Sequence, residues 1–90
     1  MNKTLADLRK EIDTVDDELV NLLAKRFAVV REIGKLKKLQ QIQPLDERRW
    51  KDVLQKITEK AKNRDIPQDL VKKIYDEIHK TALSLEKDHE

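Results

Sequence analysis

Residues 5–40 read LADLRKEIDTVDDELVNLLAKRFAVVREIGKLKKLQ, and this stretch decides the fold. Alternating steps of three and four residues mark a heptad stripe on a single helix. The stripe consists of Leu5, Leu8, Ile12, Val15, Leu19, Leu22, Arg26, Val29, Ile33 and Leu36. Every position but one is apolar, so the sequence predicts one long amphipathic helix that ends near Gln40.

The exception is Arg26, which places a guanidinium where an apolar side chain belongs. Arginine is almost never fully buried without a partner, and it stays charged at any working pH. No carboxylate shares the stripe, so one interpretation is that Arg26 binds an anionic ligand. The alternative is that a single polar residue in the seam sets the register or the oligomeric state.

The predicted helix is too long for its own chain to cover. At about 1.5 Å per residue it extends roughly 50 Å, whereas a compact chain of 90 residues has a radius of gyration of only about 12 Å. The apolar stripe therefore needs a cover, most simply a second copy of the same helix. We predict an intertwined homodimeric helical bundle.

Two shorter helices are expected after the long one. Pro44 ends the first segment, Asp46 is a suitable N-cap for a helix that reaches about Asn63, and a third helix runs from about Pro67 to Lys87. No stretch alternates with period two, so the fold class is all-α, with three helices in a single domain over residues 1–90. We expect the C-terminal tail to fray beyond Glu86.

Composition excludes several functions. The chain has no cysteine, no apolar run long enough to span a membrane and no apolar signal segment at its start, so we expect a cytoplasmic protein. Its net charge is only +2, both signs are interspersed, and it has one Trp, one Tyr and one Phe, which argues against nucleic-acid binding. The histidines have no partners spaced as metal ligands, so we expect no metal site.

Several other polar or small residues have positions that point away from a simple surface role. Lys37 follows Arg26 by three helical turns, and Arg9 lies beside the stripe but roughly 25 Å from Arg26, within reach only if it comes from an antiparallel partner helix. Gly34 lies mid-helix, where a close neighbour would explain it, and Glu86 continues the apolar face of the third helix. Each has a simpler alternative: a solvated Lys37, Arg9 or Glu86, and an incidental Gly34.

The order and spacing of these residues resemble the all-helical chorismate mutases. The resemblance rests on Leu8-Arg9-Lys-Glu-Ile12-Asp13, Leu22-Leu-Ala-Lys-Arg26 and Ile33-Gly34-Lys35-Leu-Lys37, and continues through Asp46-Glu-Arg-Arg49. It implies an intertwined dimer with two shared sites that rearrange chorismate to prephenate without a cofactor. By this resemblance Arg26 and the partner's Arg9 grip the substrate carboxylates, and Lys37 hydrogen-bonds the ether oxygen.

The resemblance also implies the remaining site residues, together with three departures from the family pattern. Asp46 and Arg49 match an Asp-x-x-Arg motif in which the Asp backbone binds the ring hydroxyl; Ile33 and Leu83 complete the expected substrate-binding set. Trp50 stands where many members carry a hydroxyl-binding Glu, Ala82 replaces a small polar residue, and Glu86 replaces a Gln that donates to the ether oxygen.

Alternative functions follow from these departures. Isochorismate pyruvate-lyases share the scaffold and the cations, and a mutase for aminodeoxychorismate is a further possibility on the same scaffold. A different class is a non-catalytic helical dimerisation or regulatory module. Such a module predicts that Arg26→Leu stabilises the dimer without loss of function, whereas an enzyme predicts loss of turnover.

Overall fold

A computed structural model describes residues 2–87 of the chain, and the described part consists of three α-helices with no strand. They are α1 (Leu5–Leu39), α2 (Glu47–Lys62) and α3 (Gln68–Lys87). This confirms the predicted all-α class, and the helix ends lie within a residue or so of those expected. α3 reaches Lys87, one residue past the point where we expected fraying, and the rest of that tail lies outside the described residues.

Local hydrogen bonds explain where α1 begins. Thr4 and Asp7 form a capping box: the Asp7 backbone N–H donates to Thr4 Oγ1 at 3.1 Å, and the Thr4 N–H donates to Asp7 Oδ2 at 3.0 Å. The hydrogen bonds from the Thr4 backbone and side chain hold the pKa of Asp7 below its ordinary value. The capping box fixes the start of the helix four residues into the chain.

The chain reverses at two residues with left-handed backbone. Gln41, in the connection after α1, has a φ of 57°, and Asp65, in the connection after α2, has a φ of 56°. Asp46 then caps α2 by accepting from the Arg49 N–H at 3.0 Å, as its sequence position predicted. Pro67 directly precedes α3, which needs no N–H from it.

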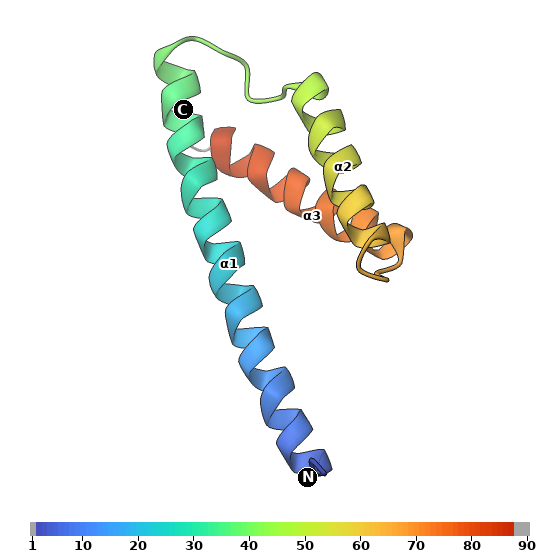
Figure 1. The fold of residues 1–90 in the computed structure, drawn as a ribbon. Coiled ribbons are helices and arrows are strands. Elements are labelled where there is room, and N and C mark those ends of the chain that lie inside the picture. The colour runs from blue at the N-terminus through green and yellow to red at the C-terminus, as the bar shows by residue number, and fades with distance from the viewer. Residues whose placement is uncertain (1, 88–90) are drawn as a thin grey trace.

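α3 is the central element of the packing (Figure 1). Its C-terminal part lies against the C-terminal half of α1 and its N-terminal part against α2, so α3 bridges two helices that do not contact each other. The buried apolar residues are few and small: Val30, Ala61, Ile78 and Ala82. No large side chain among the described residues is fully buried, so the chain encloses only a thin core.

The N-terminal half of α1 projects away from the other helices, as Figure 1 shows. The described chain extends over 58 × 24 × 16 Å with a radius of gyration of 16.8 Å, well above the roughly 12 Å of a compact chain of this length. The apolar residues of the stripe stay exposed along it; Leu5, Ile12, Val15, Leu19 and Leu22 each expose more than half of their surface. No described helix is long and apolar enough to cross a membrane.

Candidate active site

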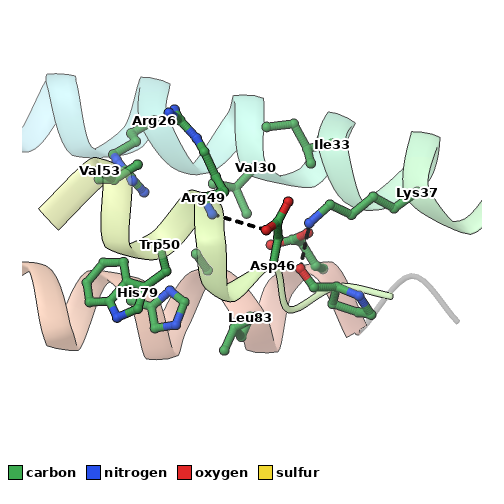
Figure 2. Close-up of a pocket in the computed structure, with 13 residues that line it drawn as sticks. Arg26, Val30, Ile33, Lys37, Asp46, Arg49, Trp50, Val53, His79 and Leu83 are labelled. Carbon is green, nitrogen blue, oxygen red and sulfur yellow. Dashed lines mark hydrogen bonds and ion pairs between the residues drawn. The ribbon is translucent and has the colours of Figure 1, made fainter. Parts of the chain in front are cut away.

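A cleft lies where the C-terminal half of α1, the start of α2 and the second half of α3 come together. Its volume is about 320 Å³. Nine of its lining residues were predicted from the sequence as site residues: Arg26, Ile33 and Lys37 from α1; Asp46, Arg49 and Trp50 from the start of α2; and Ala82, Leu83 and Glu86 from α3. Figure 2 shows most of these side chains pointing into the space between the helices.

Lys37 and Glu86 form a half-buried ion pair at one end of the cleft. The Lys37 ammonium lies 2.8 Å from Glu86 Oε1, and the two side chains expose only 21% and 10% of their surface. The pair is close by distance, but its angle is not that of a hydrogen bond, since Oε1 has no hydrogen-bond partner among the described residues. The ammonium instead donates a hydrogen bond to the carbonyl oxygen of Pro44. Glu86 therefore points inward, as the face of α3 predicted.

Gly34 explains how Glu86 reaches this position. A Cβ on Gly34 would lie 2.9 Å from Glu86 Cα and 3.3 Å from its carbonyl oxygen. Helix α3 therefore passes so close to α1 that only glycine fits at this crossing. This is the close approach of another backbone that the mid-helix glycine indicated, and it seats Glu86 beside Lys37, one turn further along α1.

Arg26 faces the cleft without a counter-ion. Its side chain is half-buried, and its Nη1 atom is buried with no hydrogen-bond partner in the described structure. The guanidinium carbon lies 5.6 Å from the centre of the Tyr75 ring, a cation–π distance. A buried donor on a permanent cation is costly to leave unpaired. The arrangement is that of a site ready to receive an anion.

The residues that the start of α2 contributes to the cleft differ in how far they are buried. Trp50 is half-buried and stacks on His79 of α3, with ring centres 3.9 Å apart and planes inclined by 9°. Arg49 lines the cleft, but its guanidinium is exposed and bonds Asp52 at 3.2 Å. Asp46 also lines the cleft, with one carboxylate oxygen used as the helix cap. Trp50 thus forms part of the cleft wall, whereas Arg49 lies towards its mouth.

Arg9 is the one predicted site residue that this chain does not bring to the cleft. It is exposed on the projecting half of α1, seventeen residues and roughly 25 Å before Arg26. Its role at the site stays a prediction from the sequence.

Four lining residues were not predicted as site residues: Val30, Pro44, Val53 and His79. Val30 lies off the heptad stripe, and Pro44 was noted only as a helix breaker. A sequence signal did exist for His79, which lies four residues after Tyr75 and three before Ala82 and so shares their face of α3. Among the described residues, no group of His, Cys, Asp and Glu side chains is arranged to hold a metal ion.

The helical fold and the cation-lined cleft define a small helical domain suited to binding an anion. Its family is shown by sequence comparison: the model of the family "Chorismate mutase type II" matches residues 8–87, so the chain belongs to that family.

The relatives differ in length from this chain. The bifunctional chorismate mutase/prephenate dehydratase of Aquifex aeolicus is 34% identical over 88 residues, and the T-protein of Enterobacter agglomerans is 30% identical over 84 residues. These matches cover 92% and 93% of this chain but only 24% and 22% of those proteins. The chorismate mutase of Methanocaldococcus jannaschii is 25% identical over 89 residues, covering 99% of this chain and 90% of that protein.

Proposed function

We propose that this chain catalyses the Claisen rearrangement of chorismate to prephenate, a step towards the aromatic amino acids, in two sites shared by a homodimer. The observation that carries the proposal is Arg26, a half-buried cation whose Nη1 lacks a hydrogen-bond partner, in a cleft that also contains Lys37. A dianionic substrate supplies the charge that this cleft lacks.

The rearrangement requires that the enolpyruvyl group is oriented over the ring and that the negative charge developing on the ether oxygen is stabilised. The ether C–O bond of the substrate breaks while a C–C bond forms between the enolpyruvyl methylene and the ring, and no proton is transferred. Holding the flexible enolpyruvyl group over the ring converts binding energy into rate. Arg26 and the partner's Arg9 would each hold one carboxylate, with the apolar side chains of Ile33, Ala82 and Leu83 packing against the ring between them.

Lys37 is the residue proposed to act on the breaking bond. Negative charge grows on the ether oxygen as the C–O bond lengthens, and a fixed ammonium there stabilises the transition state more than the ground state. An ammonium has three donors, and the carbonyl of Pro44 takes one of them. The neighbouring Glu86 would assist only when protonated, because an ionised carboxylate cannot donate a hydrogen bond.

The residues at the start of α2 would complete the site. The backbone at Asp46 would bind the ring hydroxyl, Arg49 would support the mouth of the cleft, and Trp50 would form its wall. The dimer supplies Arg9 and covers the exposed apolar stripe of α1. The single-domain organisation of residues 1–90 and a cytoplasmic location stay predictions from the sequence.

The test is an absorbance assay for the disappearance of chorismate, with product analysis by NMR. We expect prephenate from chorismate with the wild-type protein, and neither salicylate nor pyruvate from isochorismate. Arg26→Leu should lose at least about a hundredfold in kcat/KM, because it removes a charge-assisted contact to the substrate. The matched control is Arg31→Leu, which removes an exposed arginine from the same helix. Wild-type protein that leaves chorismate unchanged would refute the proposal.

A further inference from the structure

The stacked pair of Trp50 and His79 is the feature of the cleft that the proposed mechanism does not use. The rings lie 3.9 Å apart and nearly parallel, with an interplanar angle of 9°. Both side chains are half-buried and both line the cleft, as Figure 2 shows at the end opposite the labelled Lys37. A stacked arrangement holds the imidazole in one plane and so directs its nitrogens.

This pair lies towards the same end of the cleft as Arg26 (Figure 2). The Arg26 guanidinium lies 5.6 Å from the Tyr75 ring, and Tyr75 precedes His79 by four residues, one turn along the same face of α3. Lys37 instead pairs with Glu86, seven residues or about 10 Å farther along α3. Arg26 and His79 therefore serve one end of the cleft, and Lys37 serves the other.

The imidazole nitrogens of His79 are available for a ligand. Among the described residues, the His79 ring stacks on Trp50, and neither ring nitrogen of His79 forms a hydrogen bond. A neutral imidazole offers one donor and one acceptor, and a protonated one offers two donors and a charge. Ala82, one turn further along α3, lines the cleft but has no polar atom in its side chain.

Building on the proposed function, we propose that His79 is a substrate-binding residue that donates a hydrogen bond to the carboxylate held by Arg26. Trp50 is the positioning residue that fixes the plane of the imidazole. The carboxylates keep their charge throughout the rearrangement, so this contact is equally strong in the ground state and the transition state. It therefore lowers KM and leaves kcat unchanged.

The contact is stronger when the imidazole is charged. We expect KM for the dianion to fall as pH falls, because protonation adds a positive charge and a second donor to the imidazole. The charged and titratable groups that line this cleft besides His79 are Arg26 and Lys37 from α1, Asp46 and Arg49 at the start of α2, and Glu86 from α3, and Tyr75 lies next to Arg26. The arginines keep their charge throughout. Glu86 acts at the ether oxygen and so on kcat, which separates its effect from the effect of His79 on KM.

The experiment compares kcat and KM for chorismate at about pH 5.5 and about pH 8 in wild type and in His79→Phe. Phenylalanine keeps a flat ring against Trp50 and lacks the nitrogens. We expect a wild-type KM about tenfold lower at the acid pH, and a raised KM without this dependence in the variant, with kcat unchanged by the substitution. Trp50 is the only tryptophan. Its emission should therefore follow the charge of His79 in wild type and lose that transition in His79→Phe.

Two further variants keep the test decisive. His79→Gln retains a donor but cannot become charged, so its KM should be independent of pH and close to the wild-type value at about pH 8. If circular dichroism shows that His79→Phe is unfolded, His79→Gln takes its place in the test. Thr81→Ala, an exposed position on α3, is the control. A wild-type KM at both pH values in His79→Phe overturns this inference alone, whereas an inactive wild type overturns the proposed function as well.

Discussion

Gly34 and Glu86 touch across the crossing of α1 and α3, and the missing side chain of one sets the place of the other. A Cβ at Gly34 would lie 2.9 Å from Glu86 Cα, closer than packed atoms come. The obstructing atoms belong mostly to the backbone of α3, which cannot rotate away as a side-chain tip can. The end of α3 and the ion pair of Glu86 with Lys37 depend on this one absent methyl group.

Gly34→Ala should therefore separate stability from activity. Alanine favours the helix by about 1 kcal/mol over glycine, which offsets part of the roughly 1–3 kcal/mol that overpacking costs. The net loss in the free energy of unfolding should then be no more than about 2 kcal/mol. The displacement of Glu86 should nevertheless lower kcat about tenfold or more, because small misplacements at a reacting centre are costly. Thermal melts and steady-state kinetics measure both effects.

The neighbouring exposed residue supplies the control for this variant. Lys35→Ala changes the helix next to Gly34 without touching α3, and it should keep the wild-type kcat. Full activity in Gly34→Ala would show that the position of Glu86 does not matter for turnover.

The exposed stripe of α1 predicts that the folded chain is an obligate dimer. Leu19 exposes 56% of its surface in the single chain and lies in the N-terminal half of α1. Leu19→Glu would place a charge in the buried seam, which is strongly unfavourable without a partner. The variant should be monomeric or unfolded at micromolar concentration, whereas Glu18→Gln, an exposed neighbour, should stay dimeric.

Sedimentation equilibrium measures this directly. The melting temperature of the wild type should also rise with protein concentration, because unfolding is coupled to dissociation. A folded, active monomer of the wild-type chain would contradict the prediction.

A site shared between protomers predicts complementation. Arg9 and Arg26 are too far apart on one α1 helix to hold the same small ligand. Arg9→Ala and Arg26→Ala chains should each be nearly inactive. When the two are unfolded and refolded together, each heterodimer contains one site with both arginines and one with neither, so activity should return. Heterodimers proven by mass spectrometry that stay inactive would argue for a site within one chain.

The sequence allowed the helices to be placed because their ends have local causes. Thr4 and Asp46 each accept a hydrogen bond from a residue three positions later, so these caps can be predicted from the local sequence. The inward direction of Glu86 and the close approach at Gly34 could also be predicted, since each follows from its position on a helix face.

Contacts that depend on how two helices cross could not be predicted in this way. The stack of Trp50 on His79 joins residues on different helices, and nothing in either local sequence selects the other as a partner. Arg49 differs from this case: its spacing placed it at the cleft, and its ion pair with the exposed Asp52 is a local contact between residues three apart on α2. The spacing along α1 predicted that Arg9 reaches the site only from a partner chain, and this stays a prediction.

The ion pair of Lys37 with Glu86 leads to a prediction about acid. Ionised Glu86 would place a negative charge next to the ether oxygen on which negative charge develops, and it holds the ammonium meant for that oxygen. Protonated Glu86 releases Lys37 and donates a hydrogen bond of its own. The active form is then the protonated one, so kcat should rise as pH falls. Glu86→Gln has the same shape and a permanent donor, so it should flatten this profile and raise kcat near neutral pH.

The exposed Glu77→Gln on α3 is the matched control and should keep the wild-type profile. Identical curves of kcat against pH for wild type and Glu86→Gln would exclude Glu86 from the reaction.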